Sequence, residues 1–264
     1  MSETRLNKFV ASCTELSRRE ADRLIQEGGI SVNGHLCENP ATRVTSDDLV
    51  RRGPDVLQPQ KTQVIAFHKP RGLVCTHRDE RSRKTIYNLL PHKYHHLNHV
   101  GRLDLDSEGL LILTNDGELA QKLTHPSKKL EKEYLVTVNQ SLESSLLLQL
   151  VKGVFTEEGQ AKAKKATQVS ARRLSIVLET GMKRQIRLML ETLGYRVTKL
   201  VRLRVGSLTL GELPLGETEE LPVEAINQLL TNPSPPEPKE NPSNRKRPAK
   251  KNGNKRPPRK PGAR

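Results

Sequence analysis

The first sixty residues show helical spacing of apolar positions twice, followed by a hairpin signal. Four apolar side chains recur at i, i+3, i+4 and i+7 on one predicted helix face: Leu6, Phe9, Val10 and Cys13. A second helix is predicted from Ser17, because Ser17 and Glu20 have the spacing of a capping box, to the pair Gly28-Gly29. Asn33-Gly34 then lies between two short extended runs and favours a type I′ turn. The pattern predicts a small helix-helix-hairpin module over residues 1–60.

From residue 64 onward, strand-like and helix-like patterns mix without regular alternation. Apolar extended runs predict strands at 64–75, 110–114, 131–138 and 195–210, the first of them broken at Pro70 and Gly72. Helical spacing predicts helices at 117–126, 142–154, 181–194 and 223–230. This order favours an α+β fold over a doubly wound parallel sheet. We expect a domain over residues 63–230, joined to the first module by a flexible linker at 58–63.

The charge of the chain is strongly positive and unevenly placed. Of 264 residues, 45 are Lys or Arg and 30 are Asp or Glu, which gives a net charge of +15, while aromatic residues make up only 3%. Residues 231–264 hold eleven of the basic residues, two Glu and nine prolines. Such a segment buries too little apolar surface to offset the entropy of ordering, so we expect a disordered basic arm. The charge favours nucleic acid as the partner over a small apolar ligand.

Cysteine content and hydropathy indicate a cytoplasmic chain. Cys13, Cys37 and Cys75 are odd in number and widely spaced, which predicts neither a disulfide framework nor a Cys-x-x-Cys metal pair. The first residues lack the apolar core of a signal peptide, and no apolar run approaches the roughly 20 residues that span a bilayer. We therefore expect a soluble protein without membrane contact, and a monomer by default.

Three acidic residues at alternating positions, Asp104, Asp106 and Glu108, precede the apolar run at 110–114. A calcium loop is one interpretation, but its twelfth position would be Asn115, which cannot supply a bidentate carboxylate. A two-carboxylate magnesium site is another, although no phosphate-binding Gly-rich loop is near. In a third, one carboxylate is a nucleophile that is fixed in the turn and kept ionised by an Arg such as Arg102. A purely structural turn stays open.

A histidine-rich stretch is a second candidate for metal chemistry, and its members are His92, His95, His96 and His99. His95 and His99 have the i, i+4 spacing that would suit zinc on a helix. The stretch contains no Asp, Glu or Cys and leads into the acidic motif. A polar segment that faces RNA is therefore the favoured interpretation, and no metal is expected.

Five basic residues of the first module lie off the apolar helix faces and could follow a phosphate backbone: Arg5, Lys8, Arg18, Arg19 and Arg23. An ordinary solvated surface would use the same residue types. The segments "RLNKFVAS", "SRREADRLIQEGGISVNG" and "DDLV" resemble, in order and spacing, the small RNA-binding module first seen in ribosomal protein S-four. This resemblance covers residues 4–57 and implies that the module binds RNA.

A second resemblance covers residues 64–230. The motifs "HKPRGLVC", "GRLD", "DSEGLLILTNDGELAQKLTHP", "EKEYLV", "RQIR" and "KLVRLRVGSLTL" follow the S-four-like module in an order that is similar to the RsuA-type family of ribosomal RNA pseudouridine synthases. The resemblance implies a catalytic domain with a mixed, largely antiparallel sheet flanked by helices. It also implies isomerisation of one uridine of ribosomal RNA to pseudouridine, with the large subunit favoured. No cofactor is expected, because the reaction needs neither redox chemistry nor energy input.

The same resemblance implies roles for four residues of the catalytic domain. Asp104 matches the catalytic aspartate, which attacks either the uracil ring or the ribose. Tyr134 matches the tyrosine that lies against the uracil, and Arg187 matches the basic residue that pairs with the aspartate. Leu200 corresponds to an apolar residue packed under the site. Without the resemblance, Tyr134 and Leu200 would be interpreted as ordinary core residues.

Three further basic residues are expected to contact the RNA phosphates, namely Arg102, Lys183 and Arg184. Asp106 and Glu108 then become turn and loop acids. The substrate would be ribosomal RNA or a pre-ribosomal particle. The alternative from another functional class is a non-enzymatic RNA-binding factor for ribosome assembly that uses the same fold.

Overall fold

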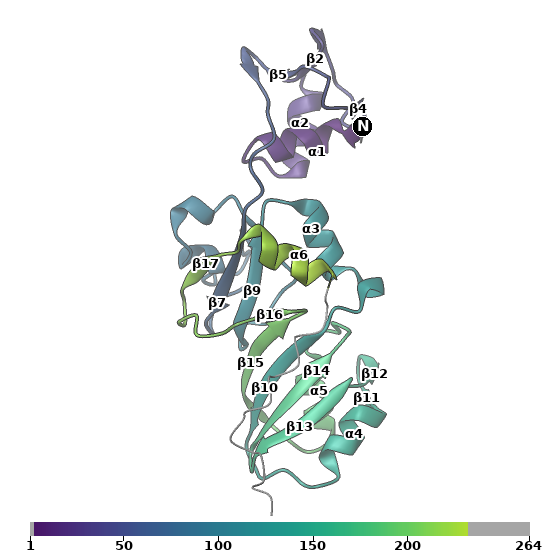
Figure 1. The fold of residues 1–264 in the computed structure, drawn as a ribbon, viewed down its shortest axis with the longest axis vertical. Coiled ribbons are helices and arrows are strands. Elements are labelled where there is room, and N and C mark those ends of the chain that lie inside the picture. The colour runs from purple at the N-terminus through teal and green to yellow at the C-terminus, as the bar shows by residue number, and fades with distance from the viewer. Residues whose placement is uncertain (1–2, 232–264) are drawn as a thin grey trace, which may run out of the picture.

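The computed structural model describes residues 3–231, so residues 232–264 of the predicted basic arm lie outside the described residues. The described residues form a small N-terminal module and a larger domain built on one sheet (Figure 1). None of the helices in this range is both long enough and apolar enough to span a membrane.

The N-terminal module contains two helices and two small sheets. The helices are α1 (Leu6–Cys13) and α2 (Arg18–Gln26). The strands are β1 (Thr4–Arg5), β2 (Ser31–Val32), β3 (His35–Leu36), β4 (Arg43–Val44), β5 (Val50–Arg52) and β6 (Asp55–Val56). The predicted Ser17–Glu20 capping box is present, and Asn33 and Gly34 have φ of 52° and 86° at the hairpin turn. The helix-helix-hairpin prediction is confirmed.

The linker after this module contains no helix or strand but is held at both ends. The backbone N–H of Gln60 donates to the Ser12 carbonyl at 2.9 Å. On the other side, Asn115 accepts from the Gln63 N–H at 2.9 Å and donates to the Lys61 carbonyl at 2.9 Å. The linker that we expected to be flexible is therefore fixed against both parts of the chain.

The larger domain is built on a nine-stranded mixed sheet with the order β13-β14-β10-β15-β9-β7-β17, with β16 beside β15 and β8 beside β9. Its strands are β7 (Val64–Lys69), β8 (Asn98–Val100), β9 (Glu108–Thr114), β10 (Lys132–Val138), β13 (Lys165–Ser170), β14 (Arg173–Leu178), β15 (Val197–Val205), β16 (Leu208–Thr209) and β17 (Thr218–Glu220). A separate hairpin pairs β11 (Val154–Thr156) with β12 (Gly159–Ala161). Among the strand pairs of this sheet in residues 3–231, β9 with β15 is the parallel one and the others are antiparallel, which confirms the predicted mixed, largely antiparallel sheet of an α+β fold.

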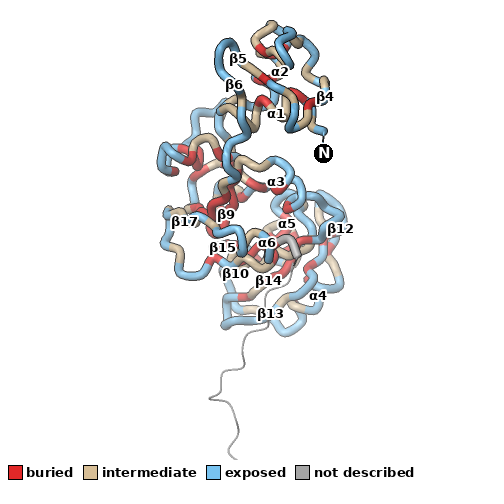
Figure 2. Tube along the Cα trace, turned by 45° about the horizontal axis from the view of Figure 1, so that its top comes forward, coloured by how far each residue is buried: buried red, intermediate tan, exposed pale blue. Residues whose placement is uncertain are grey.

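Helices and loops cover both faces of the sheet and form three apolar cores. The first core joins α4 (Leu146–Lys152) and α5 (Gln185–Thr192) to β10, β14 and β15. The second joins α3 (Gly117–Thr124) and α6 (Val223–Thr231) to β7, β9 and β15. The third lies between β7, β9 and the segment that holds η1 (Ile86–Asn88) and η2 (His92–Tyr94), while η3 (Pro126–Lys128) follows α3. All residues of β9 are consequently buried (Figure 2).

The sheet has two halves, one with β13, β14, β10 and β15 and the other with β9, β7 and β17. They meet at a very short parallel junction between β9 and β15. Only two residue pairs form it, Val201 with Glu108 and Arg202 with Gly109. A Cβ atom on Gly109 would lie 2.3 Å from the carbonyl oxygen of Arg202 and 2.5 Å from its nitrogen. Gly109 also has a φ of +112°, which other residues rarely adopt. The junction therefore requires glycine at this position.

A β-bulge in β15 sends two neighbouring arginines to opposite faces of the sheet. In the pairing with β10, Arg204 lies opposite Glu133 and Arg202 lies opposite Tyr134, which leaves Leu203 as the extra residue. Residues directly opposite one another in an antiparallel pair share a face. Arg202 therefore lies on the face of Tyr134, and Arg204 lies on the face of Glu133.

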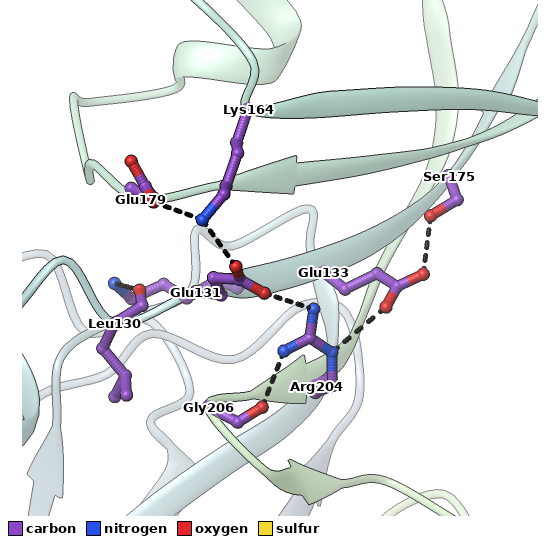
Figure 3. Close-up of polar contacts among 9 residues, drawn as sticks. Leu130, Glu131, Glu133, Lys164, Ser175, Glu179, Arg204 and Gly206 are labelled. Atoms are coloured by element: carbon purple, nitrogen blue, oxygen red, sulfur yellow. Dashed lines mark hydrogen bonds and ion pairs between the residues drawn. The ribbon is translucent and has the colours of Figure 1, made fainter. Parts of the chain in front are cut away.

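Arg204 is the centre of a charged network on that second face (Figure 3). Its side chain is 5% exposed and donates to Glu131 at 3.0 Å and to Glu133 at 3.1 Å. Lys164, just before β13, pairs with the other oxygen of Glu131 at 2.8 Å and with Glu179 at 2.6 Å. The network ties both acids of the "EKEY" segment to one face, so the residues that alternate with them face the opposite side.

Gly109→Ala is expected to destabilise the protein by more than about 3 kcal/mol, because the new methyl group overlaps the backbone of β15. Gly159→Ala is the matched control, since Gly159 has a φ of +109° and a methyl group added there would meet no atom within 4 Å. The control should be destabilised only by the cost of placing alanine at a positive φ, about 1–2 kcal/mol. Urea unfolding measures both variants, and equal losses would mean that the close approach at the junction imposes no constraint.

Glu131→Gln is expected to destabilise the protein by about 1.5 kcal/mol at pH 7 and by much less at pH 3.5. Burial raises the pKa of this carboxyl, but hydrogen bonds from Lys164 and Arg204 outweigh that effect and bring the pKa below the ordinary 4.5. A carboxyl with a depressed folded-state pKa stabilises the fold above its unfolded value, and this contribution disappears as the pH falls through the folded value.

The measurement for Glu131 is urea unfolding at intervals from pH 7 to pH 3.5. Glu157→Gln is the control, because Glu157 is exposed and its loss should cost less than about 0.5 kcal/mol at any pH. A loss for Glu131→Gln that does not change with pH would contradict the assignment of this carboxylate to the network.

Candidate active site

A cleft of about 610 Å³ opens where the two halves of the sheet meet, and we refer to it as the central cleft. Its walls come from the loop before β9, from β10 and β15, and from the segment that leads into α5. The sequence-predicted residues that line it are Arg102, Asp104, Tyr134, Lys183, Arg184 and Leu200. Residues up to 100 positions apart in sequence are thus brought to one surface.

Asp104 lies in a tight turn of the loop between β8 and β9. The backbone N–H of Ser107 donates to the Asp104 carbonyl at 3.0 Å and closes this turn. The preceding Leu103 is buried, and Asp104 is half-buried on the wall of the central cleft. Its carboxylate makes no hydrogen bond and no ion pair within 4 Å to any residue of the described range. An anionic group without a partner is therefore available to a bound molecule.

Lys69, at the end of β7, binds the backbone of this loop. It is completely buried, and its ammonium donates to the carbonyls of Asp104 at 3.2 Å, Ser107 at 3.0 Å and Pro70 at 3.0 Å. These bonds use all three donors of the group. Burial lowers the pKa of Lys69, and the charge of Asp104 opposes part of that shift. The residue fixes the loop without neutralising the Asp104 carboxylate by direct contact.

Two arginines from other elements bind the backbone of this loop and of the first residues of β9. Arg202 on β15 donates to the Leu110 carbonyl at 2.7 Å and, with a long contact of 3.5 Å, to the Arg102 carbonyl. Arg187 on α5 donates to the Asp106 carbonyl at 3.0 Å. We call Lys69, Arg187 and Arg202 the loop cations, because each of them binds backbone carbonyls of residues 102–110.

The ion pair that we expected between Arg187 and Asp104 is not formed within the described structure. The guanidinium of Arg187 reaches the carbonyl of Asp106, two residues further along, and the carbonyl of Val197 at 3.3 Å. Its Nε is buried and has no hydrogen-bond partner in the described part of the chain. Burial lowers the pKa of Arg187, against the raising effect of the Asp104 and Asp106 charges. Arg187 thus acts on the Asp104 carboxylate through its positive charge and not through a direct ion pair.

Tyr134, on β10, also lines the central cleft. It is half-buried and packs against two of the three cores, those on either side of the junction. Nothing in residues 3–231 forms a hydrogen bond with its hydroxyl group. Leu200 is 5% exposed and belongs to the first core while it also lines the cleft, so its core role and its site role coincide.

The structure removes one of the interpretations of the acidic motif. Residues 110–114 belong to strand β9, so the calcium-loop interpretation is wrong. Glu108, expected in a loop, is the buried first residue of β9 and pairs with Lys199 at 3.2 Å, while Asp106 is 4.0 Å from Arg184. The described residues hold no cluster of three or more acids, histidines or cysteines suited to a metal ion.

The histidine-rich stretch does not present a zinc pair either. His99 lies in strand β8 and His95 follows the short helix η2, so the two are not on one helix face. His95 contacts the Leu90 carbonyl at 3.0 Å, and His99 contacts the Gly101 carbonyl at 2.8 Å. Both rings therefore serve local backbone contacts.

Among the basic residues predicted for the N-terminal module, four are exposed, namely Arg5, Arg18, Arg19 and Arg23. Lys8 differs, because its ammonium pairs with Glu118 in the first turn of α3 and links the module to the larger domain. In the larger domain, Arg102 and Arg184 are exposed. Lys183 is exposed as well and lies 3.6 Å from Glu158.

The three most buried cations of the domain are not among the residues predicted from sequence, and they are Lys69, Arg202 and Arg204. Lys69 follows four apolar residues and His68 at the end of β7. The two arginines alternate with apolar residues, a pattern that is typical of solvent-facing positions. A lysine that ends a strand beginning with four buried apolar residues is a usable signal, because lysine is almost never fully buried unless it has partners. The bulge that separates Arg202 from Arg204 leaves no mark in the sequence pattern.

Comparison with known proteins agrees with this architecture. A family model described as RNA pseudouridylate synthase matches residues 63–192, and the S4 domain model matches residues 4–50. The chain is 34% identical over 231 residues to the ribosomal large subunit pseudouridine synthase B of Bacillus subtilis (strain 168), covering 85% of this chain and 95% of that protein. The protein of the same description from Yersinia pestis is 33% identical and is covered over 74% of its length.

A solved structure described as a pseudouridylate synthase gives the same result in three dimensions. It superposes with a TM-score of 0.62 and 28% sequence identity, over 85% of this chain and 99% of that one. The similarity therefore includes the N-terminal module as well as the domain that carries the central cleft. The chain belongs to the RNA pseudouridine synthase family, the enzymes that isomerise uridine to pseudouridine within RNA.

Proposed function

We propose that this protein converts a uridine of large-subunit ribosomal RNA to pseudouridine, with Asp104 as the nucleophile. The observation that carries the proposal is the Asp104 carboxylate, which is fixed through its backbone but has no side-chain partner in the described structure, on the wall of the central cleft. The relatives from Bacillus subtilis and Yersinia pestis act, by their descriptions, on the large ribosomal subunit. They support that substrate over the small subunit.

The residues of the central cleft fit the steps of this isomerisation. The bond between N1 of uracil and C1′ of ribose breaks, the base turns, and C5 joins C1′ while the C5 proton moves away. Asp104 is the group that reacts with the nucleoside. Tyr134 lies against the uracil, and its hydroxyl oxygen helps to take up the C5 proton in the second half of the reaction, as the hydroxyl passes its own proton to solvent. N1, which has left C1′, gains one proton, so no proton is gained or lost overall. The net change is neither redox nor energy-requiring, so the residues need no cofactor.

The target base must leave its stack before it can enter the cleft, which costs a few kcal/mol. Contacts to RNA phosphates offset this cost, and we assign them to the exposed arginines of the N-terminal module together with Arg102 and Arg184 at the cleft. We also propose that the protein works as a monomer on ribosomal RNA in the cytoplasm.

Loss of the gene should remove one pseudouridine from ribosomal RNA, and complementation should restore it only when Asp104 is present. The measurement is carbodiimide mapping by primer extension in cells that lack the protein, complemented with wild type, Asp104→Ala or Asp106→Ala. Asp106→Ala is the matched control, because the Asp106 carboxylate lies 4.0 Å from Arg184 and the bond from Arg187 goes to the Asp106 backbone carbonyl, which the substitution keeps.

Restoration of the missing site by Asp104→Ala would show that this carboxylate is not the nucleophile. Persistence of every pseudouridine in the deletion strain would overturn the enzymatic proposal and favour the non-enzymatic assembly factor. Loss of a site in the small-subunit RNA would keep the enzyme and the nucleophile and correct only the substrate.

Tyr134→Phe is expected to bind RNA normally but to slow single-turnover pseudouridine formation by about 10²–10⁴-fold, the range of a lost general base. Phe keeps the aromatic ring that packs between the two cores and removes only the hydroxyl. Tyr134→Leu should weaken RNA binding and also slow pseudouridine formation, because it removes the aromatic ring as well as the hydroxyl. An unchanged rate for Tyr134→Phe would restrict the residue to packing against the base.

A further inference from the structure

Lys132, the first residue of β10, places a second ammonium group in the central cleft. Its side chain is half-buried, and its Nζ donates to one group of the described structure, the Leu130 carbonyl at 3.2 Å. An ammonium has three donors, so two of them remain available. No carboxylate of the described residues lies within 4 Å of this group.

The residues around Lys132 leave its ammonium in a positively charged environment. Arg202 lies opposite Tyr134 on the same face, and its own hydrogen bonds go to backbone carbonyls and not to an acid. The two glutamates next to Lys132 in the sequence, Glu131 and Glu133, are bound to Arg204 on the other face of the sheet. Burial lowers the pKa of Lys132, and the Arg202 charge lowers it further.

The two acids that line the central cleft, Asp104 and Glu179, do not compensate Lys132. Glu179 is paired with Lys164 at 2.6 Å. The charge of Asp104 acts on Lys69 and Arg187, two of the loop cations. Two cations of one cleft, Lys132 and Arg202, thus lack an anion, which is a costly arrangement unless a bound group supplies one.

We propose that Lys132, with Arg202 behind it, binds a backbone phosphate of the RNA strand next to the target uridine. The inference rests on the proposed function, since it takes the bound polyanion to be RNA. A phosphate supplies both the negative charge and the acceptor oxygens that the two free donors of Lys132 require. The uracil base is neutral and cannot do so. Arg102, which was predicted from sequence to contact phosphate, is exposed at the cleft. Lys132 would therefore be a second cation that holds the RNA strand there.

Salt dependence tests this contact directly. The substrate is an RNA fragment that contains the uridine identified by mapping, and the measurement is kcat/KM between 50 and 200 mM KCl for wild type, Lys132→Met and Lys132→Arg. Lys132→Met should lower kcat/KM by about 10- to 100-fold at low salt and should reduce the slope of log(kcat/KM) against log[KCl] by about one. Lys132→Arg should retain the slope and most of the rate.

Lys152→Met is the matched control, because Lys152 is an exposed residue at the end of α4 and should change neither rate nor slope. A slower Lys132→Met enzyme that keeps the wild-type slope would overturn the proposal and leave Lys132 with a structural role, as would a rate equal to wild type. Thermal unfolding of each variant identifies any loss of fold, in which case Lys132→Arg against wild type carries the comparison. Failure of the wild type to modify the fragment would count against the proposed function instead.

Discussion

Three cations, Lys69, Arg187 and Arg202, hold the backbone of residues 102–110 in place by binding its carbonyl oxygens. Lys69 comes from β7, Arg187 from α5 and Arg202 from β15, so the loop is fixed only when all three elements are in place. Burying a charge is costly unless polar groups surround it, and here the loop carbonyls do so. The arrangement holds the backbone of Asp104 rigidly and leaves its carboxylate without a protein partner within hydrogen-bonding distance in the described structure.

The position of the loop depends in turn on the junction between the two halves of the sheet. β9 and β15 approach closely through Gly109, and the bulge at Leu203 then sends Arg202 to the cleft and Arg204 to the opposite face. Arg204 and its glutamates fix the start of β10, which is the strand that carries Tyr134. A local irregularity in one strand therefore sets which side chains reach the site and which stabilise the sheet.

The periodic parts of this fold are readable from the sequence because local chemistry determines them. The capping box at Ser17, the turn at Asn33-Gly34 and the helix at 185–192 each depend on residues a few positions apart. The grouping of Asp104, Tyr134 and Leu200 followed from resemblance to a family. The roles of Lys69 and Arg202 depend on contacts across many tens of residues and on an unpredictable bulge, and so does the place of Arg187 behind the loop. Local patterns carry no information about such contacts.

The tie between the two parts of the chain has a consequence for how a target is selected. The linker is bound at Gln60 and Gln63, and Lys8 pairs with Glu118, so the exposed arginines of α2 stand at a set separation from the central cleft. An RNA that engages both must present its phosphates and its reactive nucleotide with that same separation in three dimensions. The folded shape of the RNA then contributes to recognition beyond its base sequence. A uridine in an unfolded strand has no defined position relative to the phosphates that contact the N-terminal module.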